Sequence, residues 1–195
     1  MAYHATLSPL NASVTGSEAS GEATFTINGD DLTIHIEMKG VPPDMAHLQH
    51  FHGFAEGDKA SACPTAADDK NGDGIIDLVE TEPVAGTTMV PFNDNPLGTD
   101  LLALDTFPKA DANGTYTYET TVSLKALEKA FAERFPGQQL DLDRRVIFVH
   151  SIPDSIELPS TVQSLGDFPA SLTLPIACGK IEAGSAATPQ ATPAS

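Results

Sequence analysis

Several residue types that mark common classes of protein are scarce or absent in this chain of 195 residues. Tryptophan is absent, and the 10 Lys and Arg are outnumbered by 27 Asp and Glu, which gives a formal net charge of −17. Such an acidic surface repels phosphates, so nucleic acid and an anionic membrane surface are excluded as partners. No apolar run approaches the roughly 20 residues of a membrane-spanning helix, so no membrane insertion is expected.

Cysteine is equally scarce, with Cys63 and Cys178 as the two occurrences. The absence of a C-x-x-C motif excludes a zinc ribbon and a thioredoxin-type site. Two alternatives stay open for the pair: buried free thiols, or one long-range disulfide that requires an oxidising compartment. The chain also begins without a basic and apolar leader. It is therefore either cytoplasmic, or secreted or periplasmic with its signal peptide absent from this chain.

Turn-forming residues, in contrast, are plentiful, with 15 Gly and 15 Pro between short segments of alternating polarity. This pattern predicts an all-β fold, an antiparallel β-sandwich or barrel. Asn28-Gly29 is a hairpin turn signal between the first two predicted strands. The predicted strands are 21–27, 32–38, 47–54, 114–122, 144–152 and 173–181.

One helix interrupts the strands, and it is predicted over residues 123–135. Ser123 is a suitable N-cap, apolar residues recur at helical spacing, and Pro136-Gly137 ends the pattern. We expect a single domain over residues 1–182. Residues 183–195 lack bulky apolar side chains, so they are predicted to be a disordered tail.

The most specific motif is the segment 69–80, whose sequence is DKNGDGIIDLVE. It matches the twelve-residue EF-hand loop, with short oxygen donors at alternate positions, a glycine at the sharp turn and a closing glutamate. The predicted Ca²⁺ ligands are Asp69, Asn71, Asp73, the carbonyl of Ile75, Asp77 through water, and Glu80. The alternative is a solvated acidic turn without an ion.

The flanks of this loop favour a structural calcium ion over a calcium sensor. Pro64 precedes the loop and Pro83 follows it, so the two long helices of a sensor EF-hand are not expected. Calcium is abundant outside cells, and the motif therefore favours an exported protein over a cytoplasmic one.

Histidines cluster in the segment His47-Leu48-Gln49-His50-Phe51-His52. On a strand, His50 and His52 point to one side and His47 to the other. Two imidazoles so placed can bind one transition metal when a third ligand joins them, and His150, at the end of an apolar strand, is the candidate. His35 is a candidate fourth ligand, because it faces away from the apolar residues of its strand. The alternative is a set of hydrogen-bonded or surface histidines.

These residues resemble a known family. The order His47-x-x-His50-x-His52, then Gly57-Asp58, then Cys63, is similar to the copper-binding strand and loop of Cu/Zn superoxide dismutase. Segment 109–114 is similar to a strand and turn of that family, 145–150 to its last copper-binding strand, and 177–181 to its C-terminal strand. The order and approximate spacing hold over most of residues 20–182. The stretch 50–53 is also similar to the CHRD family of extracellular β modules.

The resemblance implies a Greek-key β-sandwich in which the helix 123–135 is an insertion. It implies that His50, His52 and His150 bind copper and that His47 is a structural histidine behind the copper strand. It also implies a Cys63–Cys178 disulfide. The activity that it implies is that of a copper-only superoxide dismutase, with superoxide as the substrate.

The chain departs from the family at two positions that matter for chemistry. Asp69 stands where the bridging histidine is expected and the acidic loop replaces the zinc loop, so no zinc is expected. Pro175 stands where an arginine would guide superoxide, and no Lys or Arg lies between Val146 and Gly179. An anion would be steered weakly or adversely by such surroundings.

Two functions are consistent with these features. The first is an extracytoplasmic copper-binding protein, similar to superoxide dismutase, with a structural calcium site and weak superoxide dismutation. The second is a non-enzymatic, calcium-stabilised extracellular binding module of the CHRD type. Metal ions are the expected partners in both cases, and copper content separates the two.

Overall fold

A computed structural model of the chain describes residues 1–16 and 18–184, and the statements below concern that part of the chain. Strands dominate it. They are β1 (Ala2–Pro9), β2 (Ser20–Asn28), β3 (Asp31–Lys39), β4 (Gln49–Gly53), β5 (Thr87–Pro91), β6 (Tyr116–Ser123), β7 (Val146–His150), β8 (Pro175–Lys180) and β9 (Glu182–Ala183). The helices are α1 (Ala12–Thr15), α2 (Leu78–Ala85), α3 (Leu124–Arg134) and α4 (Ala170–Thr173), with short 3₁₀ turns η1 (Ala66–Asp68), η2 (Leu104–Thr106) and η3 (Leu142–Arg144).

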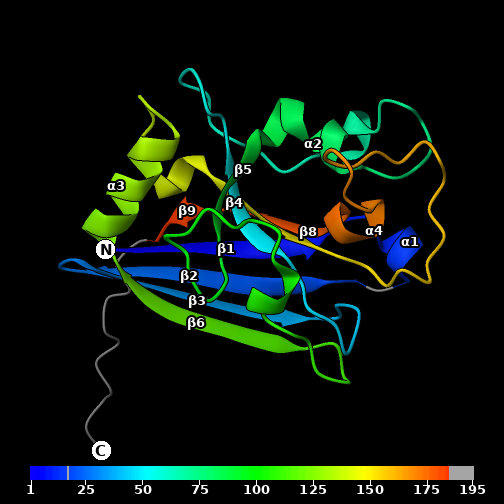
Figure 1. The fold of residues 1–195 in the computed structure, drawn as a ribbon, viewed down its shortest axis with the longest axis horizontal. Helices are drawn as coiled ribbons and strands as arrows, with labels where there is room; N and C mark the ends of the chain where they lie inside the picture. Colours follow the sequence, from blue (N-terminus) through cyan, green and yellow to red (C-terminus); the bar gives the residue numbers. More distant parts are fainter. Residues whose placement is uncertain (17, 185–195) are drawn as a thin grey trace, which may run out of the picture.

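The strands form one antiparallel sheet that curls into a half-barrel, in the order β5-β4-β7-β8-β1-β2-β3-β6, with β9 beside β1. Strand β1 joins the two parts of the sheet: residues 2–7 pair with β2, whereas Ser8 and Pro9 pair with β8. In Figure 1 the strands β1, β2, β3 and β6 lie side by side, and α2 and α3 lie on the side away from β6. The predicted all-β class is therefore confirmed.

The predicted hairpin is also confirmed. β2 and β3 pair from Ser20 with Lys39 to Asn28 with Asp31, and the turn between them contains Gly29 at φ 65°. Alternate residues of β3 are buried, as the pattern predicts, and their shared face packs into the core. Phe25 of β2 meets Phe51 of β4 at a ring-centroid distance of 5.5 Å, so the two parts of the sheet share one core.

Helix α3 forms within the predicted limits. The Ser123 hydroxyl caps it by accepting a hydrogen bond from the Ala126 N–H at 3.1 Å. Leu127 and Phe131 are buried, and the guanidinium of the buried Arg145 lies 5.3 Å from the Phe131 ring. The helical spacing of apolar residues is thus explained by packing against the sheet.

The structure adds elements that the sequence pattern did not predict. β1 and β5 are strands, and α2 is an eight-residue helix that contains Pro83. A reciprocal pair of bonds between Asp77 and Glu80 begins this helix. The three-residue turn η1 precedes the acidic loop, so within the described residues two long helices do not flank it.

The predicted tail begins later than expected. Ala183 belongs to β9 and pairs with Tyr3, and the Gly184 N–H donates to the Ala2 carbonyl. These two residues therefore continue the sheet. The rest of the predicted tail, residues 185–195, lies outside the described part of the chain.

The two cysteines form a disulfide, which decides between the two alternatives for the pair. Cys63 lies in the loop after β4, and Cys178 lies on β8, where it pairs with Phe148 of β7. The bridge therefore ties the loop that leads to the acidic segment to the strand beside β7. Among the described residues, none of the helices combines the length and apolarity that crossing a membrane requires.

Candidate metal centre

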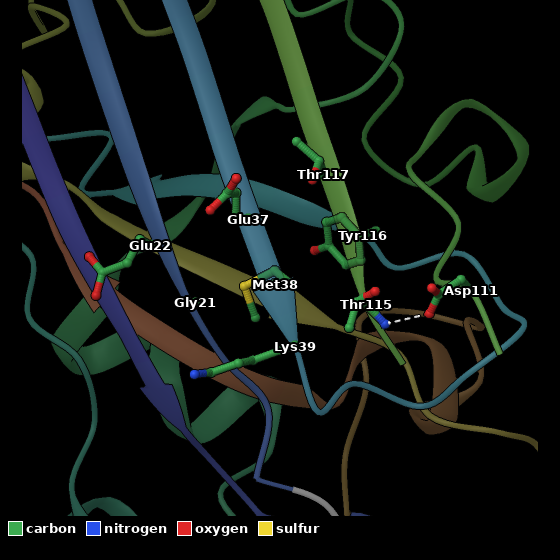
Figure 2. Close-up of a pocket in the computed structure, with 9 residues that line it drawn as sticks. All are labelled: Gly21, Glu22, Glu37, Met38, Lys39, Asp111, Thr115, Tyr116 and Thr117. Carbon is green, nitrogen blue, oxygen red and sulfur yellow. Dashed lines mark hydrogen bonds between the residues drawn. The ribbon is translucent and has the colours of Figure 1, made fainter. Parts of the chain in front are cut away.

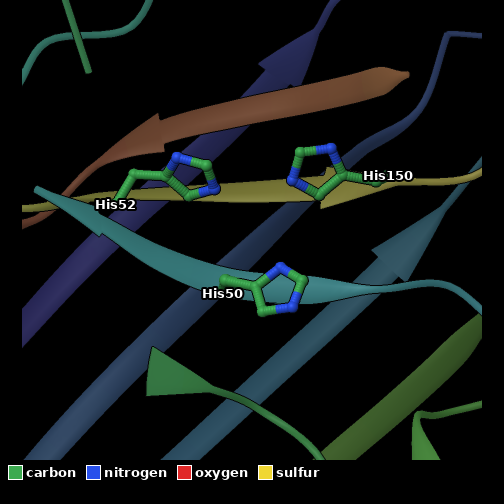
Figure 3. A group of neighbouring side chains, drawn as sticks. All are labelled: His50, His52 and His150. Carbon is green, nitrogen blue, oxygen red and sulfur yellow. The ribbon is translucent and has the colours of Figure 1, made fainter. Parts of the chain in front are cut away.

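Three histidines from two adjacent strands converge in the sheet. His50 and His52 lie on β4, which pairs with β7 on one side and with β5 on the other. His150 is the last residue of β7, beside a register shift between Val149 and His150. Figure 3 shows the three imidazole rings facing one another across the two strands. The period of two along β4 and the end of β7 thus bring together the three residues predicted from the sequence.

The three rings form a compact, buried group. Their centroids are 6.3 Å apart for His50 and His52 and 5.6 Å apart for each of the pairs with His150. One nitrogen from each ring lies within 4.8 Å of the other two. At most 3% of each side chain is exposed. The cluster could therefore hold one metal ion, and within the described residues it is the one such group of His, Cys, Asp and Glu side chains.

Backbone carbonyls fix one nitrogen of each ring. His50 Nε2 donates to Leu101 O at 2.6 Å, and His150 Nδ1 donates to Thr173 O at 2.8 Å. A longer contact of 3.4 Å joins His52 Nδ1 to Gly86 O. A neutral imidazole that donates from one nitrogen presents a lone pair at the other, so carbonyls orient the rings as metal ligands are commonly oriented.

The nitrogens left over are Nδ1 of His50 and Nε2 of His52 and His150. His50 Nδ1 is buried and has no hydrogen-bond partner. A buried polar atom without a partner costs about 1–3 kcal/mol, which a metal–nitrogen bond would offset. His52 Nε2 lies 3.3 Å from the Thr88 hydroxyl, a contact longer than a strong hydrogen bond.

Burial keeps the three rings uncharged. It lowers the pKa of His50 to about 3 and that of His150 to about 4, and the pKa of His52 falls well below its ordinary value. Repulsion from a protonated neighbour lowers the pKa of His50 and His52 further. All three rings are therefore neutral near pH 7, which is the form that binds metals.

His47 lies two residues before β4 and is not part of the cluster of three rings. Its ring is buried, with Nε2 2.8 Å from Pro42 O and Nδ1 3.1 Å from His150 O. A neutral ring has one N–H and donates to one of these carbonyls at a time. The ring also stacks on Tyr116, at a centroid distance of 5.9 Å. His47 therefore supports the backbone of His150 and does not join the three rings.

His35 is not brought to the cluster. It lies on the half-exposed outer face of β3, where its ring nitrogens approach Glu119 at 3.1 Å and Glu37 at 3.3 Å. Its position opposite the apolar residues of β3 is as the sequence predicts, but that face points to solvent. His35 therefore cannot be a fourth ligand of an ion bound by the three rings.

The acidic loop 69–80 satisfies its own backbone. Asp69 accepts hydrogen bonds from the N–H groups of Gly72 and Gly74, at 2.7 and 2.9 Å. Glu80 reaches back to the N–H groups of Lys70 and Asn71, at 2.7 and 3.2 Å. Within the described residues, the carboxylates of this loop do not form a close cluster of three ligand atoms. The side chains of the loop bond to its own N–H groups, and calcium binding there stays a prediction.

The surroundings of the cluster include residues that sequence reasoning missed. A cavity of about 40 Å³ lies beside His50 and His150. Its other lining residues are Leu48, Leu78, Thr88, Leu101, Leu102, Leu165 and Thr173. The carbonyls of Leu101 and Thr173 could not be predicted, because every residue has a carbonyl and no local pattern marks the ones that reach a histidine.

A larger groove of about 510 Å³ lies elsewhere, along β2, β3 and β6. Figure 2 shows its side chains spread along these strands, with Asp111 turned to the Thr115 N–H. Its acidic residues do not converge on a common point, and it shares no lining residue with the histidine cluster. The groove therefore offers no comparable arrangement of metal ligands.

Neither a protein-family model nor a curated protein matches this chain.

Proposed function

We propose that this protein binds one copper ion through His50, His52 and His150. The observation that carries the proposal is the unpartnered, buried Nδ1 of His50 among three neutral rings whose other nitrogens are engaged by carbonyls. Imidazole ligands suit copper, zinc, iron and nickel, and Cu²⁺ binds most tightly in the divalent series. The resemblance of the histidine motif to that of copper dismutases favours copper among these metals.

Copper in such a site supplies a one-electron couple, the chemistry by which copper dismutases convert superoxide to dioxygen and peroxide. The chain's own residues would orient the three rings and keep water from them. Phe148 packs 4.6 Å from the His52 ring and Phe107 lies 5.2 Å from the His50 ring. We propose that superoxide dismutation, where it occurs, is weak. Pro175, which replaces the guiding arginine, pairs with His150 and brings no positive charge to the site.

We further propose a structural Ca²⁺ in the loop 69–80. Asp77 and Glu80 are buried, at 1% and 9% exposure, and no ion pair with Lys, Arg or His joins them within the described residues. Buried carboxylates need compensation, which N–H groups supply in part and a cation would complete. A disulfide together with a calcium ion is typical of an oxidising, calcium-rich location, so we propose that the protein is extracellular or periplasmic.

The alternative function is that of a non-enzymatic, calcium-stabilised extracellular binding module. The apolar lining beside His50 and His150 favours it, because it gives an anionic substrate no positive group to approach. In that case the three histidines serve as hydrogen-bonded core residues. Copper content in protein purified without chelator separates the two functions.

The copper proposal is tested by titration followed by electron paramagnetic resonance, in a His4→Ala background that removes an exposed histidine. We expect one copper ion per chain with nitrogen hyperfine structure. His50→Ala and His150→Ala should each weaken binding at least 100-fold, while His35→Ala, the matched control on β3, should leave it unchanged. Equal binding by all four proteins would contradict the copper site and favour the non-enzymatic function.

A further inference from the structure

The cavity beside His50 and His150 is lined mainly by leucine side chains. Apart from the two histidines, five of its seven lining residues are leucines and the other two are Thr88 and Thr173. The Thr173 hydroxyl bonds to the Ser164 hydroxyl at 2.7 Å, whereas the Thr88 hydroxyl makes a long contact of 3.3 Å with His52 Nε2. The cavity therefore presents an apolar surface to anything that approaches the rings.

The size of the cavity limits what can enter. Its volume is about 40 Å³, and a sphere the size of a water molecule occupies roughly 10–15 Å³. This is room for one small molecule of two or three atoms.

One wall is fixed to the metal centre itself. The carbonyl of Leu101 accepts the 2.6 Å hydrogen bond from His50, so the segment that contributes Leu101 and Leu102 is joined directly to a ligand ring. Asp100 in turn accepts bonds from the N–H groups of Leu102 and Ala103, which hold the segment in its turn. Hydrogen bonds therefore hold this wall in a fixed position beside His50.

The charge of the surrounding chain opposes anions. The segments 75–90, 94–108 and 151–174, which supply most of the lining, contain no Lys or Arg but several Asp and Glu. An anion entering the cavity of the metal-free protein would lose its hydration without gaining a positive partner, so a bound copper ion would be the one positive charge to attract it. An uncharged molecule meets no such barrier.

We propose that the centre of His50, His52 and His150 admits small uncharged diatomic molecules of the dioxygen and carbon monoxide class more readily than anions such as superoxide. This inference rests on the proposed copper site for the bond to the metal, whereas the apolar cavity is a property of the protein alone. The leucine walls select the ligand by size and charge. The three imidazoles supply the metal to which that ligand binds.

The test has one arm without metal and one arm with copper. Crystals of the metal-free protein are pressurised with xenon, an apolar atom that reports on the cavity whatever metal the histidines bind. Copper-loaded protein is then treated with carbon monoxide in the Cu(I) state and with azide in the Cu(II) state. Infrared absorption of the C–O stretch and the azide-to-copper absorption band measure the two ligands.

A charge placed at the mouth of the cavity sharpens the test. Leu165 lines the cavity and is 48% exposed, so Leu165→Arg adds a guanidinium at the rim. Leu97→Arg is the matched control, because Leu97 is 37% exposed and lines a different pocket. We expect Leu165→Arg to tighten azide binding about three- to tenfold, and Leu97→Arg to leave it unchanged.

The outcomes separate this inference from the copper proposal. Xenon beside His50 and His150, carbon monoxide on Cu(I) and weak azide binding would support the inference. Azide bound as tightly by the wild type as by Leu165→Arg, or a cavity that takes no xenon, would overturn it even where copper binds. If xenon enters the cavity but the protein binds no copper, the apolar cavity is supported and the copper proposal is contradicted.

Discussion

The histidine cluster and the acidic loop 69–80 use opposite ways of gathering donor atoms. The three rings of the cluster are at most 3% exposed and stand on two paired strands in the sheet. In the loop, Asn71 is exposed and Asp69 and Asp73 are half-buried, and their oxygens bond to the loop's own N–H groups. Neutral donors can be packed together by a scaffold without an ion, whereas charged donors repel one another until a cation joins them.

This difference leads to a general expectation about the two regions. The histidine cluster should keep its geometry in the metal-free protein, because strands, carbonyls and burial already hold it. The loop should change when calcium binds, because its carboxylates must leave backbone N–H groups to face the ion.

The disulfide links the segment that leads to the acidic loop with β8, the strand beside β7, and its removal should have the largest effect on stability. Replacing both Cys63 and Cys178 with Ser should lower the free energy of unfolding by about 3–4 kcal/mol, because a long loop is released in the unfolded chain. Urea denaturation with and without a reductant measures this. We expect copper affinity to change less than threefold, because β4 and β7 remain paired. A loss below about 1 kcal/mol would show that the bridge is not a stabilising link.

Calcium should have the next largest effect, and it should be confined to the loop. At a calcium concentration 100 times the dissociation constant, the folded state gains about 2.7 kcal/mol, which raises Tm by about 5–10 °C. Glu80→Gln should abolish that rise. Glu82→Gln, on the exposed side of the same helix, is the control and should preserve it. If Tm does not change when calcium or a chelator is added, the loop is an acidic turn without an ion.

Acid should weaken the metal-free protein through its histidines. The pKa of His50 is lowered to about 3 and that of His150 to about 4, against about 6.5 in the unfolded chain. Between these values the unfolded state binds protons that the folded state does not, so stability falls as the pH drops below 6.5. At pH 5.5 the loss is about 1.4 kcal/mol for each of these imidazoles.

Unfolding at pH 7.0 and pH 5.5 in the presence of a chelator measures this loss. His150→Gln should reduce the difference in the free energy of unfolding between the two pH values by about 1.2 kcal/mol. His4→Gln, on the exposed end of β1, should leave it unchanged. An identical pH dependence in all three proteins would show that the buried rings do not control the acid response.

Alternating polarity and turn residues in the sequence predict much of the fold. Alternation in 32–38 predicts the buried face of β3, and Asn28-Gly29 predicts the hairpin, because both depend on neighbouring residues alone. Strand β1 was missed although Ala5 and Leu7 are buried on one face. A pair of small and medium apolar residues gives a weak signal, and the pairing of β1 with both β2 and β8 depends on distant segments.

The histidines of the cluster could be predicted from the sequence, whereas the residues that surround them could not. The histidine spacing on β4 predicts which rings share a face, and the structure brings His150 to them through the pairing of β4 with β7. The Leu101 carbonyl and the leucine walls carry no such spacing, because they come from an irregular loop placed by tertiary contacts. His35 was a candidate by alternation, but alternation alone does not distinguish a buried site from a solvent-facing side of the sheet.

The most direct test of the histidine centre is diffraction at the copper absorption edge from crystals of the protein loaded with one equivalent of copper. We predict a single anomalous peak about 2 Å from each of three atoms, Nδ1 of His50, Nε2 of His52 and Nε2 of His150. A peak at His4 or within the loop 69–80 and none among the three rings would contradict the assignment of these histidines as the metal centre.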